Sequence, residues 1–399
     1  MKEADVAVIG AGVSGISAAV TAARLGCRTL LIEKSSSAGG IAVKGNINTI
    51  CGLFIERPGG GPEMLYNGFA EEFASQLMRR DKVDSPIKMG RVYVLLSRTK
   101  TIAETIHTLL ESEPKLFIKY LTTFCDVRLS NDRISHIEAI VSGSRHKIKV
   151  GAVLDCSGDA VVCRSAGVTV IGTDELHQVP AIIFPLINII KSPSGFSIMA
   201  VRVKMLVKQA VNQGFLPQGA EAVSLLPMLE KNSIAVKLNL GRFLKQSPKI
   251  KNSELDKKAK ELMDHIFRFL QKKADGFGKC QIPSGSYSVL HRDGIKAKGV
   301  YVISARDVLN EKKFSDPAAK GCWPIEKWDS AGNLNIQYLS DGAYYDIPKQ
   351  SLRVSEIRNL MVAGKCISAD NDAIASARVI GTCLATGESA ARMAVRSLA

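Results

Sequence analysis

The first pattern that could do chemistry is a run of glycines near the start of the chain. Gly10, Gly12 and Gly15 have the spacing G-x-G-x-x-G and directly follow the apolar residues 4–9. In this spacing the first glycine permits a tight turn, the second lets the backbone approach a pyrophosphate, and the third lets a helix pack closely on the strand. The N-terminus of that helix offers unpaired N–H groups to phosphate oxygens. The pattern therefore predicts a dinucleotide-binding turn.

An acidic residue completes this fingerprint. Glu33 lies 23 residues after Gly10, where a carboxylate accepts hydrogen bonds from the ribose hydroxyls of adenosine. The elements that must position these residues are a strand over 4–9, a helix over 13–25 and a strand over 28–33. A tight turn between strand and helix without any ligand is the alternative interpretation.

Three other residues stand in patterns that suit proton or redox chemistry. In the run His291-Arg292-Asp293-Gly294 the imidazole could transfer a proton and the guanidinium could hold an anion, although a lone histidine in a turn is more often structural. Cys51 lies in a glycine-rich stretch and could be a redox partner or a covalent tether, with simple packing as the alternative. The six histidines stand singly, and we expect no metal site.

Other segments predict the elements between these residues. Residues 63–80 and 101–112 have the apolar spacing of helices, and residues 253–273 predict one long amphipathic helix. Three β-like runs within 116–154 are separated by turn residues and predict a β-meander.

Three features favour FAD over NAD as the dinucleotide. Gly39 and Gly40 soon follow the acidic residue, the meander ends in a second glycine turn at 155–159, and a strand over 359–363 leads to a helix over 378–396. This arrangement resembles the FAD-dependent oxidoreductases of the glutathione-reductase fold, and among them the family related to the fumarate reductase flavoprotein. There is no second G-x-G-x-x-G, so NADH or NADPH, if used, should bind only transiently.

The resemblance is closest in residues 359–368, 376–383 and 387–391, and it is poor over 171–285. It implies that the following residues bind FAD: Gly10, Gly12, Ser14, Gly15, Glu33, Lys34, Gly39, Gly40, Val127, Gly158, Gly364, Val379, Ile380 and Thr382. The helix that opens near Val379 would direct its N–H groups at the N1 and O2 edge of the flavin, where negative charge develops on reduction.

The same resemblance singles out Arg378. It stands where fumarate reductases hold a substrate carboxylate with an arginine, whose planar fork donates two parallel hydrogen bonds. The alternative is a structural arginine that pairs with Asp370 or Asp372. Trp323 could form a wall of the substrate site or pack in the core.

Charge and composition exclude several other classes of protein. The net charge is +15, and residues 231–279 carry 13 Lys and Arg against 5 Asp and Glu. We interpret this segment as a solvated basic face, because no aromatic residues alternate with the cations as nucleic-acid binding would need.

No apolar run reaches the roughly 18 to 20 residues of a membrane span. The nine cysteines form no C-x-x-C pair, and no secretory signal opens the chain, so we expect a cytoplasmic protein.

Together these observations predict an α/β fold with a Rossmann-like FAD-binding domain from residues 1–170 and 346–399 that includes the β-meander. An inserted mixed α+β substrate domain should span 171–345.

The expected function is an FAD-dependent oxidoreductase that moves a hydride or electrons between a non-covalently bound flavin and a small organic substrate, for which Arg378 favours an anion. The alternatives are an NAD(P)H-driven flavin monooxygenase, an FAD-holding electron-transfer or scaffold subunit, and an RNA-modifying flavoprotein. An oligomer or a redox partner protein is compatible with each.

Overall fold

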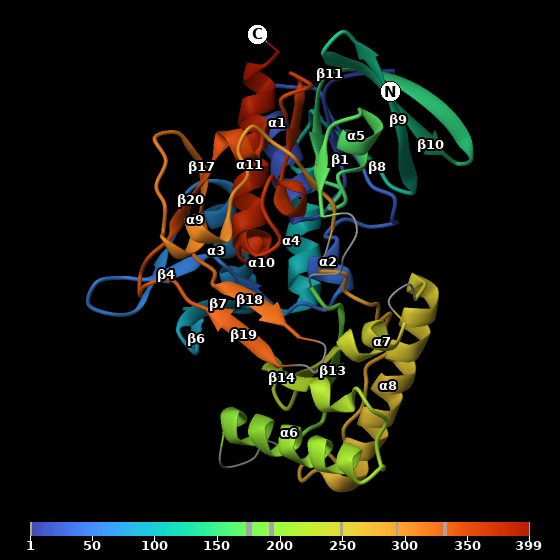
Figure 1. Cartoon of the computed structure of the whole chain (residues 1–399), viewed down its shortest axis with the longest axis vertical. Helices are drawn as coiled ribbons and strands as arrows, with labels where there is room; N and C mark the ends of the chain where they lie inside the picture. Colours follow the sequence, from blue (N-terminus) through green and yellow to red (C-terminus); the bar gives the residue numbers. More distant parts are fainter. Residues whose placement is uncertain are drawn as a thin grey trace.

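The computed structural model describes residues 2–172, 178–190, 195–247, 250–292, 294–329 and 333–398. Helices and strands alternate along both ends of the chain, and these ends meet in one layered unit, while the middle of the chain extends away from it (Figure 1). Among the residues that the structure describes, no helix has the length and hydrophobicity needed to span a lipid bilayer.

A seven-stranded sheet forms the centre of the layered unit. Its order is β8 (Leu116–Lys119), β2 (Thr29–Ile32), β1 (Glu3–Ile9), β11 (Ser144–Asp155), β10 (Arg133–Val141) and β9 (Thr122–Ser130), with β21 (Leu360–Val362) also paired to β11. The pairs β8–β2, β2–β1, β1–β11 and β11–β21 are parallel. Successive residues of β1 face opposite sides, and both sides are covered from residue 6 onward, which explains the unbroken apolar run over 6–9.

The three strands predicted over 4–9, 28–33 and 359–363 are confirmed as β1, β2 and β21. The predicted start of the β-meander is wrong. Its first run divides into β8, which extends the parallel sheet beside β2, and β9, which begins the meander. Leu121 separates the two strands in the left-handed conformation with φ of 50°, a geometry that no strand continues through.

Two long helices lie side by side against this sheet (Figure 1). They are α1 (Val13–Arg24), which confirms the helix predicted over 13–25, and α11 (Ile380–Arg396). Their backbones approach closely, because a Cβ atom on Gly387 would stand 2.1 Å from the carbonyl oxygen of Ser14. The hydroxyl of Ser17 donates to the carbonyl of Leu384 at 2.7 Å across the same contact.

Helix boundaries differ from the predictions where glycine or a strand intervenes. The helix predicted over 63–80 begins only at α3 (Phe69–Asp81), because β5 (Pro62–Met64) and Gly68 at φ of 76° precede it. The helix over 101–112 is confirmed as α4 (Thr99–Glu111). The last helix, predicted from 378, begins at Ile380, and the short α10 (Ala373–Ala377) lies just before it.

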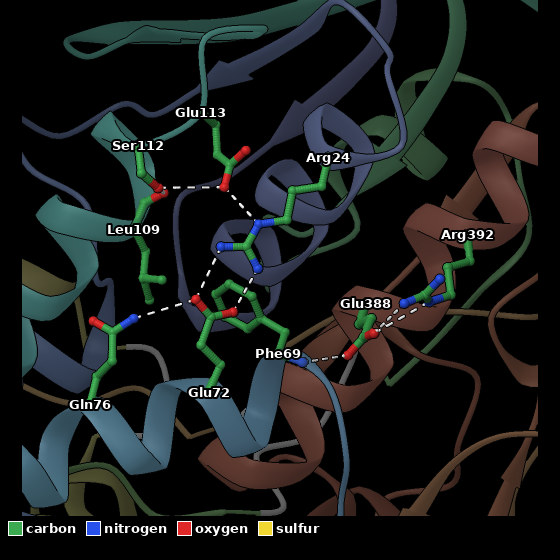
Figure 2. A network of polar contacts seen from close by, with 9 residues as sticks. All are labelled: Arg24, Phe69, Glu72, Gln76, Leu109, Ser112, Glu113, Glu388 and Arg392. Carbon is green, nitrogen blue, oxygen red and sulfur yellow. Dashed lines mark hydrogen bonds and ion pairs between the residues drawn. The ribbon is translucent and has the colours of Figure 1, made fainter.

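A network of charged residues ties these helices together (Figure 2). The guanidinium of Arg24, at the end of α1, bonds Glu72 of α3 and Glu113 beyond α4, both at 2.6 Å. Its hydrogen bond to Glu72 raises the pKa of Arg24 above the ordinary value. Glu388 of α11 accepts a hydrogen bond from the backbone N–H of Phe69 at 2.9 Å, so it binds the first turn of α3. These contacts join the C-terminal end of α1 to α3 and to the segment after α4, and they join α11 to the first turn of α3.

A second hydrophobic cluster lies in the middle of the chain. Its elements are β13 (Ala181–Leu186), α6 (Phe196–Asn212), β14 (Val223–Pro227), β15 (Ile234–Asn239), α7 (Gly241–Gln246) and α8 (Asn252–Lys273), and its sheet has the order β13-β15-β14. The core of this cluster draws only on residues between 182 and 289. The helix predicted over 253–273 is confirmed as α8, which buries Leu255, Ala259, Leu262, Ile266 and Leu270.

Residues 303–345 pack differently from this middle part. Ile303, Ile325 and Tyr345 belong to the same cluster as α1 and α11. The elements in this stretch are α9 (Ala305–Leu309), β17 (Pro317–Gly321), β18 (Ile325–Trp328), β19 (Leu334–Gln337) and β20 (Tyr345–Pro348). The remaining elements are α2 (Ile41–Lys44), β3 (Thr49–Cys51), β4 (Phe54–Glu56), β6 (Ile87–Met89), β7 (Val92–Leu96), α5 (Val161–Ser165), β12 (Val170–Ile171) and β16 (Lys296–Ala297).

Candidate functional site

The glycine-rich turn has open space where a ligand would need it. Nothing lies within 4 Å of the position that a Cβ atom on Gly12 would take, and Gly12 is the N-cap of α1 without any capping side chain. By contrast, a Cβ atom on Gly15 would stand 1.8 Å from the carbonyl oxygen of Gly10. Gly12 therefore leaves room for a ligand beside unpaired N–H groups, whereas Gly15 serves the packing of helix on strand.

Glu33 holds this turn in place. One of its carboxylate oxygens accepts from the backbone N–H of Ala11 and the other from that of Ser35, both at 2.8 Å. Each carboxylate oxygen has a further lone pair, so the same group can also accept from ribose hydroxyls. Gly39 donates its N–H to the carbonyl of Ala11 at 2.8 Å, which brings the second glycine pair against the first turn. Lys34 is exposed at the edge of this region.

The second glycine turn lies at the end of β11. Asp155 is fully buried and accepts from the N–H groups of Val162 and Cys163 at the start of α5. Gly158 has a φ of 80° and donates its N–H to the sulfur of Cys366 at 3.1 Å. This turn and the first turn leave the same end of the parallel sheet, where nucleotides bind in doubly wound folds.

Other residues predicted to bind FAD lie beside α1, in the first turn of α11 and on β9. Gly364 has a φ of 65°, and a Cβ atom there would stand 2.5 Å from Oγ of Ser14, so this glycine lets the chain pass close to α1. Thr382 is fully buried and its hydroxyl lies 3.3 Å from that of Tyr66. On β9, the N–H of Val127 donates to Oδ1 of Asp126 at 2.9 Å and to Oγ of Ser165 at 3.1 Å, and its contact with adenine stays a prediction.

The start of α11 adjoins a group of charged side chains. Val379 is the N-cap of α11 and has no capping side chain, which leaves the first N–H groups of a 17-residue helix for a ligand. Arg378 lies directly before it, in the break after α10. A Cβ atom on Gly52 would stand 2.5 Å from the side chain of Val379, so the turn that follows Cys51 packs against this helix end.

Four charged residues from separate elements form the group, which we call the cation cluster: Lys237 of β15, Arg292, Glu326 of β18 and Arg378. Glu326 is its single carboxylate. The ammonium of Lys237 lies 3.9 Å from Glu326 and 4.1 Å from the ring centroid of Trp328. The indole N–H groups of Trp323 and Trp328 both donate to Glu326, at 3.2 and 2.7 Å.

Burial perturbs the protonation of the cluster. Burial, reinforced by Arg292, lowers the pKa of Lys237 to about 7, although Glu326 opposes this. Burial and then the charge of Arg378 lower the pKa of Arg292 to about 10. Burial alone would raise the pKa of Glu326, but Lys237, Trp328 and Arg292 together bring it below the ordinary value. With three cations and one carboxylate, the cluster carries excess positive charge and suits an anionic ligand.

Two buried donors at the cluster point to a missing acceptor. Arg292 donates through Nη2 to Oδ1 of Asn239 at 3.1 Å. Among the described residues, Nη1 of Arg292 and Nδ2 of Asn239 have no hydrogen-bond partner, although both atoms are buried. Such donors cost free energy when left unpaired. A carboxylate or carbonyl of a ligand would satisfy both.

The structure brings only some of the predicted substrate residues together. The charges of Arg378 and Glu326 act on Arg292, and Arg292 acts on Lys237, whereas His291 is affected by Asp256, Lys365 and Asp159. His291 therefore does not belong to the cluster, and burial lowers its pKa. Asp293 lies outside the described residues.

The two acids that could be structural partners of Arg378 bond other groups, and Cys51 is in an environment that disfavours its thiolate. Asp372 pairs with Lys327 at 2.9 Å and Asp370 accepts from the N–H of Ala373, while Arg378 donates to the amide oxygen of Gln178 at 3.4 Å. Burial raises the pKa of the Cys51 thiol, which disfavours the reactive thiolate.

Sequence reasoning missed four residues of this site: Lys237, Asn239, Glu326 and Trp328. Lys237 was counted in the basic segment 231–279 and interpreted as part of a solvated face. That interpretation is wrong for this residue, because its side chain is only 12% exposed. The available signal was a lysine inside the apolar strand 234–239, where a charge needs a partner.

Nearly the whole chain matches one protein-family model. A family model described as FAD dependent oxidoreductase matches residues 5–399. No curated protein matches the sequence.

Solved structures resemble the chain at low identity. A geranylgeranyl bacteriochlorophyll reductase-like protein of Thermoplasma acidophilum is 15% identical with a TM-score of 0.49, over 98% of this chain and 78% of that one. The p-nitrophenol 4-monooxygenase of Pseudomonas putida is 11% identical with a TM-score of 0.45, over 97% and 78%. A flavoprotein/dehydrogenase of Cytophaga hutchinsonii is 12% identical with a TM-score of 0.47, over 99% and 78%.

Proposed function

Since the chain belongs to the family of FAD-dependent oxidoreductases, we propose that it moves a hydride or electrons between non-covalently bound FAD and a small anionic substrate at the cation cluster. The observation that carries the proposal is the convergence of Lys237, Arg292 and Arg378 around Glu326 beside the start of α11. When bound, FAD supplies the redox chemistry.

The first glycine turn and the start of α11 fit FAD. Gly12 has open space beside the uncapped N-terminus of α1, which suits the pyrophosphate, and Glu33 lies next to it for the ribose. The uncapped start of α11 at Val379 suits the flavin edge that becomes anionic on reduction. Because the thiol of Cys51 favours its protonated form, we expect no covalent tether.

The cluster residues would divide the work on the substrate. Arg292 and Arg378 would bind and orient a carboxylate through their planar forks. Lys237, with a pKa of about 7, can hold or release a proton near neutral pH. Trp323 and Trp328 orient Glu326 through their indole N–H groups, and they would exclude water from the substrate.

Titration of the holoprotein with malonate tests this assignment. Malonate should perturb the visible flavin spectrum, whereas its neutral isostere malonamide should not. Arg378→Lys should retain FAD but weaken malonate binding about ten- to hundredfold, because a lysine cannot donate the forked pair of hydrogen bonds. Equal responses to malonate and malonamide, or an unchanged affinity in Arg378→Lys, would remove the cluster from the substrate site.

The source of the electrons separates the leading function from its alternatives. A flavin monooxygenase should show NAD(P)H oxidation stimulated by its substrate, and a scaffold subunit should bind no malonate near the flavin. Anaerobic spectra before and after NADH or NADPH distinguish them: rapid bleaching would favour a nicotinamide-fed enzyme, and a persistent flavin band would favour reduction by the substrate or by a partner protein.

We also infer a smaller substrate-facing unit than the predicted 171–345. The second hydrophobic core supports limits near 179 and 290, since residues after 303 pack with α1 and α11. The kinship to fumarate reductase flavoproteins, the cytoplasmic location and an oligomeric or redox partner stay predictions.

A further inference from the structure

Helix α6 is apolar on two opposite faces. Its inward residues pack in the second hydrophobic cluster and are Met199, Val203, Val207 and Ala210. On the outward face Ile198, Val201 and Met205 are 47%, 58% and 67% exposed. Their spacing of three and four residues places them along one line of the helix. A helix that is apolar on both faces is normally covered on both, so the outward line indicates a partner.

Cations flank this apolar line. Arg202, Lys204 and Lys208 are exposed, and α6 contains no Asp or Glu. At about 100° per residue, Lys204 and Lys208 project on one side of the line and Arg202 on the other. Phe215, just beyond the end of the helix, is a further apolar side chain that is 73% exposed. The outward face therefore combines an aliphatic centre with a positive border.

Charge decides among the possible occupants of this face. A second copy of the chain would bring Arg202, Lys204 and Lys208 against the same residues, with no acid on the helix to compensate. Nucleic acid would leave the aliphatic line without a partner, because its bases stack on aromatic side chains. An anionic lipid surface satisfies both features, since its acyl region takes the aliphatic line and its headgroups pair with the cations.

We propose that the outward face of α6 docks this protein on an anionic membrane surface. Helix α6 lies at the end of the molecule opposite the C-terminus, far from the central sheet (Figure 1). Docking there would leave the glycine-rich turn uncovered. The net charge of +15 adds long-range attraction to such a surface. This inference does not depend on the proposed function.

Cosedimentation of the FAD-loaded protein with vesicles tests the proposal. Vesicles of phosphatidylcholine and phosphatidylglycerol in equal parts should bind the protein, and vesicles of phosphatidylcholine alone should bind it far more weakly. Each cation near the surface contributes roughly fivefold in affinity, and added salt should weaken binding. The double variant Val201→Glu with Met205→Glu should lower the partition about tenfold or more.

Val300→Glu provides the matched control, because Val300 is 54% exposed and lies outside α6. It should bind vesicles like the unaltered protein, and all variants should keep their flavin absorbance, which shows that they fold. Absence of vesicle binding, equal binding to both vesicle types, or full binding by the double variant would overturn the proposal. A dimer that the double variant converts to monomers, without vesicle binding, would assign this face to a second copy instead.

Discussion

At the scale of single residues, glycines of the same sequence motif have quite different surroundings in the structure. Gly12 and Gly15 belong to one motif, yet a Cβ atom would meet open space at the first and the carbonyl oxygen of Gly10 at the second. A motif alone does not distinguish a glycine that admits a ligand from one that admits a helix. The distinction can be tested by substitution.

We expect Gly12→Val to fold and to lose flavin, because its side chain would occupy the space of the pyrophosphate without meeting protein atoms. Gly15→Val should instead destabilise the fold, since its Cβ atom would stand 1.8 Å from a backbone oxygen. Flavin absorbance per chain and thermal unfolding of the apoproteins measure the two effects. Full flavin occupancy in Gly12→Val would remove this turn from the FAD site.

Lys237 should make anion binding depend on pH. Its pKa of about 7 means that the ammonium is present below neutral pH and lost above it. An anion binds the protonated form better, so malonate affinity should fall as pH rises through about 7. Lys237→Met should weaken binding at low pH and flatten this step, whereas Arg292, with a pKa of about 10, stays charged throughout. An unchanged step in Lys237→Met would assign it to another group.

The lowered pKa of Lys237 should weaken malonate binding as pH rises, but it should increase the stability of the ligand-free protein. Lys237 binds its proton less tightly in the folded state than in the unfolded state, where its pKa is about 10.5. Between about pH 7 and pH 10 the unfolded state therefore holds more protons, so this residue makes the ligand-free protein more stable as pH rises.

At the scale of elements, the first turn of α3 gives Glu388 a structural role that needs no ligand. Glu388 belongs to a segment selected for its resemblance to a flavin motif, yet its carboxylate accepts from the N–H of Phe69 and binds the first turn of α3 (Figure 2). Gly68 permits this approach, because a Cβ atom there would stand 2.7 Å from the carboxylate. Glu388 therefore joins α11 to α3 as a structural residue.

We expect Glu388→Ala to lower the free energy of unfolding by about 1–2 kcal/mol, since it removes the acceptor for the helix N-terminus. Arg392→Ala is the control, because it leaves the Phe69 bond intact and removes only a half-exposed ion pair, which is worth about 0.5 kcal/mol or less. Chemical denaturation of both apoproteins measures the difference. Equal losses in the two variants would show that the capping bond contributes nothing.

At the scale of the whole molecule, the cation cluster lies where two hydrophobic clusters meet. Lys237 and Asn239 come from the strand β15 of the second cluster, whereas Glu326 comes from β18, which packs with the first. Contacts nearby join the same two parts, since the side-chain amide of Asn48 donates to the carbonyl of Pro227. A ligand at the cluster would therefore touch both parts of the chain.

The sequence by itself determined the strand, turn and helix that are predicted to bind the nucleotide. The turn at 10–15, its flanking strands and helix, and Glu33 are local features, because steric limits on the backbone and apolar periodicity act over a few residues. The FAD family follows from these and from the C-terminal segment.

Only the tertiary structure decided which residues form the cation cluster and where α11 begins. Lys237, Arg292, Glu326 and Arg378 lie far apart in the chain, and no spacing rule relates them. Their meeting depends on the packing of β15 and β18, and the depressed pKa of Lys237 depends on burial that the strand pattern does not reveal. A charge in an apolar strand signals only that a partner exists, whereas the identity of that partner is a property of the fold.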